Sequence, residues 1–213
     1  MLIKACGLRS SREIDWAWNL GYDLLGVVVD PRSKRYVSPP ELEVLWREGL
    51  EHLADRCVFV ARQWEHLAGC EAFGGEVLFQ SYDGYPDRIP NKRRFLPVVS
   101  EEQWRQNWER QSAVYYLYDV SLGTGEWRGL PSWCQNKERL FVAGGLDDRR
   151  LEGLARQLES VPEDSHGWNG ALGQGFFGMD LSSGLEGPDD SGGRSRKDYD
   201  KMSLCLDVIR KGF

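Results

Sequence analysis

Residues 23–29 (DLLGVVV) form an apolar run that constrains the fold of this chain more than any other stretch. Apolar and polar residues do not alternate within it, so a strand formed here is buried on both faces. An antiparallel strand with one solvated face would alternate, whereas the strands of a parallel sheet are covered by helices on both sides. The run therefore predicts an α/β fold built on a parallel sheet.

The stretch before this run, residues 2–13 (LIKACGLRSSRE), combines a strand with a helix start. Its apolar residues favour a short buried strand that ends at Cys6, because Gly7 breaks the run. Ser10 and Glu13 then have the S-x-x-E spacing of a capping box, which predicts a helix over residues 11–20. Cys6 is therefore expected at the carboxyl end of the first strand, where parallel α/β sheets place their chemistry.

The cycle of strand, loop and helix recurs along the chain. Further strands are expected at residues 57–61, 77–80, 95–99, 113–119, 140–143 and 176–181. Helices are expected after the start signal Ser38-Pro39-Pro40-Glu41, over residues 64–70, after Ser100 with Gln103, and over residues 198–210. Residues 161–175 and 187–196 are rich in Gly, Ser or Asp and are interpreted as loops around the last strand. Eight strands alternating with helical segments predict a single (β/α)8 TIM barrel over residues 1–213, with a doubly wound open sheet as the alternative.

Composition excludes several classes of protein. The chain is 41% hydrophobic and 28% charged, which is typical of a globular protein rather than a disordered or membrane protein. Its net charge of -6 argues against nucleic-acid binding, which needs a basic face. Met1 leads into the first strand without a signal-peptide pattern, and no apolar run reaches the length of a membrane span. The five cysteines are odd in number, widely spaced and without a C-x-x-C pair, so we expect a cytoplasmic protein without a disulfide framework or structural zinc.

A barrel brings the carboxyl ends of all its strands to one mouth, which makes the list of candidate chemical groups short. Cys6 and Asp119 follow the first and sixth expected strands, so they lie on opposite sides of this mouth and could divide the roles of base and acid. Arg35 lies on the second loop, and Asp180 lies within the last strand. These four side chains are the candidate reactive and charged groups of the site.

Two turns of small residues follow the last two expected strands. They are Ala143-Gly144-Gly145 and Ser182-Ser183-Gly184. Many barrels build a phosphate site from these two loops, because small residues let backbone N–H groups approach the phosphate closely. The paired positions indicate a phosphorylated small-molecule ligand.

Each of these residues also has a purely structural interpretation. A single cysteine on an apolar strand is more often a small buried hydrophobe than a nucleophile or base, so Cys6 alone favours the structural interpretation. Asp119 could cap the next turn, Arg35 could belong to a solvated face, and the glycines could serve only tight turns. His66 and Cys70 have i, i+4 spacing without further ligands, so no metal site is expected.

Six short motifs together resemble those of phosphoribosylanthranilate isomerases, the barrel enzymes of tryptophan biosynthesis, and the match runs nearly the whole length of the chain. They are Lys4-Ala5-Cys6-Gly7, DLLG with PRSKRYVSP in the second unit, Asp119 with Gly123-Thr124-Gly125, AGGL at residues 143–146, MDLSSGLE at residues 179–186, and Lys197-Asp198. As a set these motifs are highly specific.

The resemblance implies an isomerase for the Amadori rearrangement of N-(5-phosphoribosyl)anthranilate to 1-(2-carboxyphenylamino)-1-deoxyribulose 5-phosphate, without cofactor or metal. By this resemblance Asp119 is the general acid that opens the furanose ring, and the Cys6 thiolate is the general base at C2'. Arg35 would bind the anthranilate carboxylate, and Asp180 would support the amino side. The phosphate would be held by Gly144, Gly145, Ser182, Ser183 and Gly184. We expect a monomer or a homodimer.

The middle third of the chain departs from the family pattern. Residues 80–84 read QSYDG and lack the His of the family's Q-L-H-G motif, residues 58–62 read VFVAR instead of V-F-V-N, and Pro97 lies where the family carries Lys or a small residue nearby. One alternative is therefore a catalytically idle barrel that binds a phosphate ligand. The other is the related aminoimidazole phosphosugar isomerase of the histidine pathway, against which Cys6 in place of an Asp and the lack of an internal repeat both argue.

Overall fold

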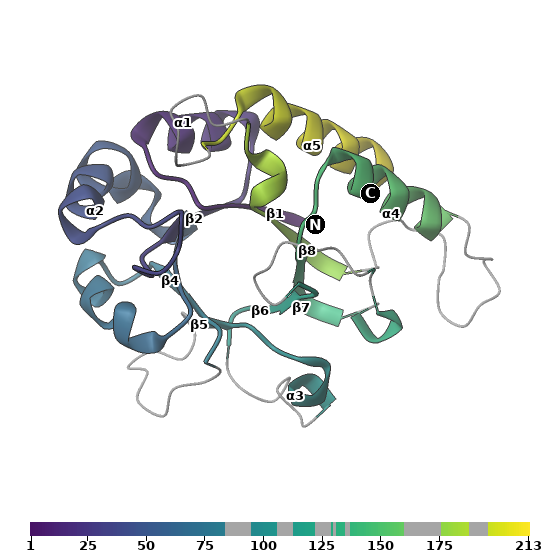
Figure 1. Ribbon diagram of the computed structural model, residues 1–213, viewed down its shortest axis with the longest axis horizontal. Helices are drawn as coiled ribbons and strands as arrows, with labels where there is room; N and C mark the ends of the chain where they lie inside the picture. The colour runs from purple at the N-terminus through teal and green to yellow at the C-terminus, as the bar shows by residue number, and fades with distance from the viewer. Residues whose placement is uncertain are drawn as a thin grey trace.

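The protein is described by a computed structural model that covers residues 1–83, 95–105, 113–121, 129, 131–134, 137–159, 176–187 and 196–213. Figure 1 looks into a ring of strands surrounded by helices. The strands are β1 (Leu2–Cys6), β2 (Leu24–Val28), β3 (Cys57–Ala61), β4 (Leu78–Ser81), β5 (Phe95–Pro97), β6 (Tyr116–Asp119), β7 (Lys137–Ala143) and β8 (Phe176–Leu181). The helices are α1 (Ser11–Leu20), α2 (Pro39–Leu45), α3 (Glu101–Arg105), α4 (Asp148–Glu159) and α5 (Tyr199–Gly212).

The eight strands form one parallel sheet in the order β5-β4-β3-β2-β1-β8-β7-β6. The ring closes between β5 and β6, where Val98 pairs with Leu117 in a parallel bridge. The backbone N–H of Val99 donates to the carbonyl oxygen of Leu117 at 2.8 Å. This nearly closed parallel barrel confirms the predicted (β/α)8 architecture over the open-sheet alternative.

Strand positions follow the buried apolar runs of the sequence. All five residues of β2 are buried, as its continuous apolar run predicts. The predicted bounds 57–61 and 176–181 are confirmed by β3 and β8. The prediction was wrong for the start of β6, which begins at Tyr116 rather than residue 113, and for β7, which begins at Lys137 and has an irregular register between Lys137 and Phe141.

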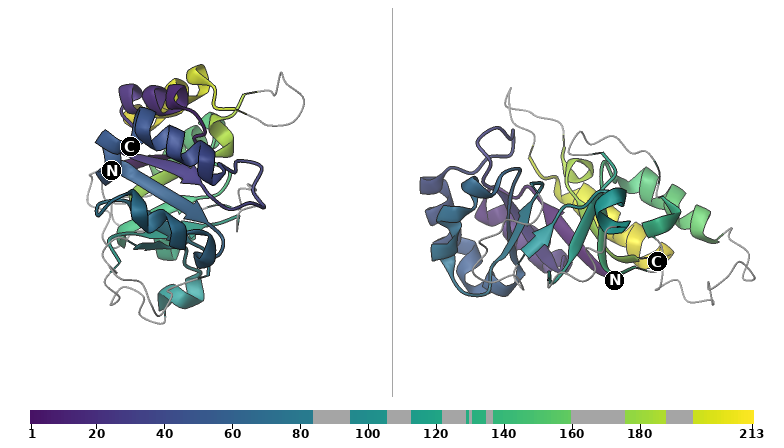
Figure 2. Two further views of the ribbon diagram at one scale, coloured as in Figure 1. Left: turned by 90° about the vertical axis from the view of Figure 1, so that its left-hand side faces the viewer. Right: turned by 90° about the horizontal axis from the view of Figure 1, so that it is seen from below.

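Two apolar clusters pack against the two faces of the barrel sheet. The larger lies between the sheet and the helices and includes Leu25, Phe59 and Leu206. The smaller fills the barrel interior and includes Val58 and Phe141. The two views of Figure 2 show the helices as an outer layer around the strands and place the two termini close together.

Caps define the helices that the sequence predicted. The Ser10 hydroxyl oxygen accepts from the Glu13 N–H at 3.3 Å and starts α1, while Gly21, with φ 96°, ends it. The Glu13 carboxylate does not complete this capping box. It accepts instead from the backbone N–H groups of Arg9 at 2.6 Å and Lys197 at 3.1 Å. Glu13 thus ties the start of α1 to the segment that leads into α5.

Three other helix predictions have mixed outcomes. Ser100 and Gln103 form the predicted reciprocal cap before the short α3. The short helix expected over residues 64–70 is present not as one α-helix but as two 3-10 helices, Trp64–His66 and Ala68–Phe73. Helix α4 was not predicted at all. Gly123-Thr124-Gly125, residues 161–175 and most of residues 187–196 lie outside the described residues.

Candidate active site

The carboxyl ends of the strands open onto a cavity of about 670 Å³. Eight of the nine predicted site residues line it, namely Cys6, Arg35, Asp119, Gly144, Gly145, Asp180, Ser182 and Ser183. The ninth, Gly184, does not. The topology therefore brings together residues from β1, β6, β7 and β8 and from the second loop.

Cys6 is the last residue of β1 and pairs with Gly26 of β2. A Cβ atom on Gly26 would lie 3.0 Å from the Cys6 Cα and 3.1 Å from its Sγ, so the absence of a side chain there makes room for the thiol. The Cys6 side chain is nearly buried, with 7% of the residue exposed. Burial raises the pKa of the thiol above its ordinary value, and the nearby Lys4 ammonium offsets only part of this rise. The resting group is accordingly a thiol rather than a thiolate at neutral pH.

Lys4 and Asp180 form an ion pair inside the barrel beside Cys6. The Lys4 Nζ lies 2.9 Å from Asp180 Oδ2, and Lys4 is 0% exposed. Burial alone would lower the pKa of Lys4, but its interactions with Asp180 and Cys6 outweigh burial, so the pKa is raised and the ammonium keeps its proton. The second oxygen of Asp180, Oδ1, is buried and has no hydrogen-bond partner among the described residues.

Lys4 was quoted as part of a motif but was not predicted as a site residue. The sequence does indicate that Lys4 is unusual, because it is a charged residue within the otherwise apolar run of the first strand. A lysine that is fully buried almost always has a partner. That partner is on the neighbouring strand, since Lys4 and Asp180 are directly paired in the register of β1 and β8.

Asp119 ends β6 on the opposite side of the cavity. Its Oδ1 accepts hydrogen bonds from the backbone N–H of Ser121 at 2.9 Å and from the Ser121 hydroxyl at 2.6 Å. Its Oδ2 accepts from the Tyr82 hydroxyl at 2.9 Å. The carboxylate is thus held on both oxygens, and Asp119 is only 4% exposed. Tyr82 follows β4, within the residues 80–84 that lack the His of the family's Q-L-H-G motif, and it was not predicted as a site residue.

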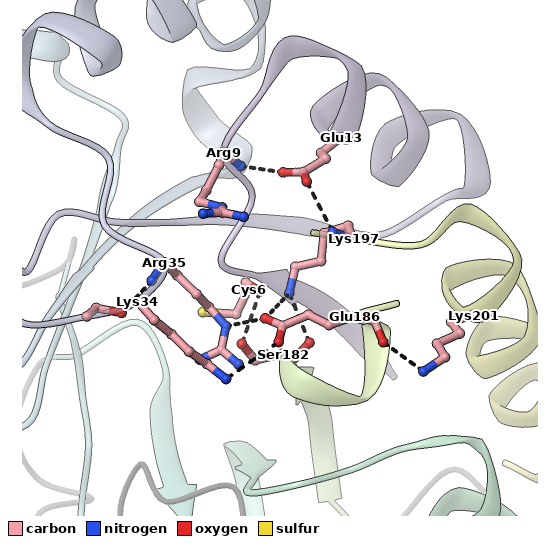
Figure 3. A network of polar contacts seen from close by, with 10 residues as sticks. Cys6, Arg9, Glu13, Lys34, Arg35, Ser182, Glu186, Lys197 and Lys201 are labelled. Atoms are coloured by element: carbon pink, nitrogen blue, oxygen red, sulfur yellow. Dashed lines mark hydrogen bonds and ion pairs between the residues drawn. The ribbon is translucent and has the colours of Figure 1, made fainter. Parts of the chain in front are cut away.

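Arg35 reaches the cavity through a network shown in Figure 3. Its Nε donates to Glu186 Oε1 in a close ion pair. The Arg35 side chain passes against Gly7, where a Cβ atom would overlap it and where φ is 84°. Glu186 also accepts from Lys197 Nζ at 3.5 Å, and Lys197 Nζ donates to the Ser182 carbonyl oxygen at 2.9 Å. The network connects the second loop to the turn that follows β8.

Lys197 is buried together with Glu186, and sequence reasoning did not assign either to the site. Burial lowers the pKa of Lys197 to about 8, with the Glu186 carboxylate opposing this change. Both residues lie in motifs quoted above, at residues 179–186 and 197–198. The sequence does show opposite charges in two segments that a barrel fold brings together. It does not show that Glu186 and Lys197 contact each other.

The two small-residue turns lie where they were predicted. Gly144 and Gly145 have φ angles of 111° and 68°, which favour glycine, and a Cβ on Gly144 would lie 2.8 Å from Asp119 Oδ1. The Ser182 hydroxyl donates to the carbonyl oxygen of Cys6 at 3.2 Å. Gly184 packs the turn after β8 against the turn after β7, since its Cβ would lie 2.8 Å from the Asp147 Cα.

All five cysteines are free and buried. Across the described ranges, no group of three or more His, Cys, Asp and Glu side chains could hold a metal ion. In the same residues, no helix has the length and apolar character needed to cross a membrane.

The parallel eight-stranded barrel and the charged cavity at its carboxyl end define a (β/α)8-barrel enzyme. No protein-family model matches the chain. The N-(5'-phosphoribosyl)anthranilate isomerase of Bacillus velezensis is 30% identical over 211 residues, which cover 86% of this chain and 86% of that protein. The chain belongs to the N-(5'-phosphoribosyl)anthranilate isomerase family.

Solved structures show the same fold. Phosphoribosyl anthranilate isomerase from Thermotoga maritima superposes with a TM-score of 0.67 at 18% identity, covering 99% of this chain and 100% of that one. A phosphoribosyl anthranilate isomerase in complex with reduced 1-(o-carboxyphenylamino)-1-deoxyribulose 5-phosphate has a TM-score of 0.61 at 18% identity, with 99% and 100% of the two chains covered. At these identities the likeness establishes the fold.

Proposed function

We propose that this chain catalyses the Amadori rearrangement of N-(5-phosphoribosyl)anthranilate to 1-(2-carboxyphenylamino)-1-deoxyribulose 5-phosphate. The observation that carries the proposal is the placement of Cys6 and Asp119 in one cavity, at the ends of β1 and β6. A rearrangement of this kind needs one group that gives a proton and one that takes a proton. The names of the relatives support the choice of substrate.

Asp119 acts first, as the general acid. Its proton goes to the furanose ring oxygen, the bond between that oxygen and C1' breaks, and a protonated Schiff base forms between C1' and the anthranilate nitrogen. Cys6, as thiolate, then removes the proton from C2', which gives an enolamine that tautomerises to the ketone. One proton is given and one is taken, so the reaction needs no other reactant.

The raised pKa of Cys6 sets a condition on this mechanism. The thiol must lose its proton before it can act as a base, and the Lys4 ammonium favours the thiolate. The cationic Schiff base adds a second positive charge in the same cavity after ring opening. The second charge favours the thiolate further, and the cationic imine also makes the C2' proton more acidic, so deprotonation follows ring opening.

The binding groups surround the two reactive ones. Arg35, held by Glu186, would bind the anthranilate carboxylate, because a guanidinium matches a carboxylate. Asp180, which lines the cavity, would support the amino side. The phosphate would be held by Gly144, Gly145, Ser182 and Ser183, with Gly184 joining the two turns. We propose a cytoplasmic monomer or homodimer that uses no cofactor or metal.

The test is the turnover of freshly prepared phosphoribosylanthranilate, followed by the loss of its anthranilate fluorescence. The native chain should turn it over, whereas Cys6→Ala and Asp119→Asn should not, while both variants keep the native circular dichroism. A folded native chain without turnover would contradict the proposal and favour the idle phosphate-binding barrel. An Asp119→Asn variant with full activity would show that the acid lies elsewhere.

A further inference from the structure

The hydroxyl of Tyr82 occupies the acid side of the cavity. It donates to Asp119 Oδ2 at 2.9 Å, while both Tyr82 and Asp119 line the cavity. The ring packs against the apolar cluster of the barrel interior. The hydroxyl is also within electrostatic range of Cys6 and Asp180. It therefore lies among the groups to which the reaction has been assigned.

Hydrogen bonds hold the backbone at Tyr82, from which the side chain extends into the cavity. The Tyr82 N–H donates to the carbonyl oxygen of Arg62 at 3.3 Å, and the Ser81 hydroxyl donates to the same oxygen at 3.3 Å. The Ser81 hydroxyl oxygen accepts from the Asp83 N–H at 3.2 Å. These bonds join the end of β4 to the end of β3, so the Tyr82 side chain starts from a defined position.

We propose that Tyr82 is a catalytic residue that relays the proton from Asp119 to the furanose ring oxygen. The proposal rests on the isomerase function above. In the step, the Tyr82 O–H bond breaks as its proton moves to the ring oxygen, and the Asp119 proton moves to the Tyr82 oxygen. The bond between the ring oxygen and C1' breaks at the same time. Asp119 ends as the carboxylate, Tyr82 is unchanged, and the substrate carries the proton.

The geometry favours a relay over direct transfer. Asp119 is nearly buried, its Oδ1 is held by both donors of Ser121, and its Oδ2 is held by the Tyr82 hydroxyl. A hydroxyl can accept one proton while it donates another, so this hydrogen bond can run in either direction. Burial raises the pKa of Tyr82 well above its ordinary value, so the hydroxyl stays protonated over the pH range of an assay. Tyr82 can therefore give its proton only as it receives another.

The test compares Tyr82→Phe with Tyr82→His in the fluorescence assay of the native chain. Phe keeps the ring and removes the hydroxyl, whereas an imidazole can accept on one nitrogen and donate from the other. The relay predicts that Tyr82→Phe lowers kcat by about 100-fold or more, with KM within about threefold of the native value. It also predicts that Tyr82→His keeps at least about ten times the kcat of Tyr82→Phe.

Tyr22→Phe is the matched control. It also removes a hydrogen-bonded tyrosine hydroxyl, here a buried one that donates to the Met202 carbonyl oxygen at 2.9 Å in the outer layer. Its kcat should equal that of the native chain even where its melting temperature falls. Inhibition by inorganic phosphate, measured on every variant, shows that the site is folded.

The outcomes separate the relay from the proposed function. An active native chain with Tyr82→Phe within about threefold of it in kcat overturns the relay and leaves the isomerase function standing. Equal losses in Tyr82→Phe and Tyr82→His also overturn the relay, because they would assign the role to the ring or to a donor that only positions Asp119. A native chain without turnover overturns the function and the relay together.

Discussion

A single methyl group added at Gly184 should destabilise this protein strongly, because the turns after β7 and β8 touch there. In Gly184→Ala the Cβ would lie 2.8 Å from both the Leu146 carbonyl carbon and the Asp147 Cα, and closer still to the Leu146 carbonyl oxygen. These are backbone atoms, so no side chain can rotate away and one turn must move. Overpacking of this kind costs about 3 kcal/mol. For a chain of this length, that lowers the melting temperature by about 6–12 °C.

Gly153→Ala is the matched control for this prediction. Gly153 lies within α4, and a Cβ there would have nothing within 4 Å. The same substitution should therefore stabilise the protein by about 1 kcal/mol through helix propensity. In calorimetry, the melting temperature should fall in Gly184→Ala and rise in Gly153→Ala. A Gly184→Ala variant that melts within about 2 °C of the native chain, with unchanged inhibition by inorganic phosphate, would refute the close packing of the two turns.

Three further predictions concern charged and reactive groups. Cys6→Ser should lower kcat by about 10³-fold while inhibition by inorganic phosphate stays the same, and unchanged turnover would remove Cys6 as the base. Lys4→Met should lower the free energy of unfolding, measured in urea, by about 3–5 kcal/mol, because it leaves the buried Asp180 carboxylate unpaired. A decrease of less than about 1 kcal/mol would contradict a buried ion pair. Lys197 should make stability rise with pH between its folded pKa of about 8 and its ordinary value of 10.5, since over that range the unfolded chain holds the proton and the folded chain does not. The gain, about 3 kcal/mol from the two pKa values, should appear as a difference in urea denaturation between the native chain and Lys197→Met, and parallel curves would contradict it.

The strands were predictable because burial on both faces leaves an apolar run in the sequence. β3 and β8 were placed to the residue, and their runs are bounded by polar residues or glycine. β6 was placed less well, since the apolar and aromatic residues before Tyr116 extend the run although Ala113 and Val114 lie outside the strand. An apolar segment that is buried without pairing to a neighbouring strand has the same composition as a strand, so composition alone does not distinguish the two.

The helices were harder to predict than the strands where their sequence pattern is weak. The buried residues described in α4 are Leu151, Leu154 and Ala155, and charged residues make up half of its sequence. Its start signal was present, because the Asp147 carboxylate accepts from the Arg150 N–H at 2.9 Å in the manner of an N-cap. The predicted helix at residues 64–70 lacks any comparable cap, since Gln63 makes no side-chain cap bond.

The sequence predicted which strand ends meet in one cavity, but not the contacts that side chains make there. The rule that strand ends share one mouth was enough to bring Cys6, Asp119 and Asp180 together. No sequence pattern could indicate that Lys4 pairs with Asp180 rather than with solvent, or that Tyr82 donates to Asp119. Such contacts depend on the register of neighbouring strands and on side-chain direction.

The closure of the barrel has a mechanical consequence for the two reactive groups. Cys6 belongs to β1, in the middle of a continuous ladder, whereas Asp119 belongs to β6, the last strand in the sheet order. The described part of the chain joins β6 to β5 through the Val98–Leu117 bridge, and the Tyr82–Asp119 hydrogen bond spans from β4 to β6 over this seam. We expect amide hydrogen exchange to be faster along β6 than along β1. Thermal opening would then displace Asp119, the proposed acid, while Cys6, the proposed base, stays in place.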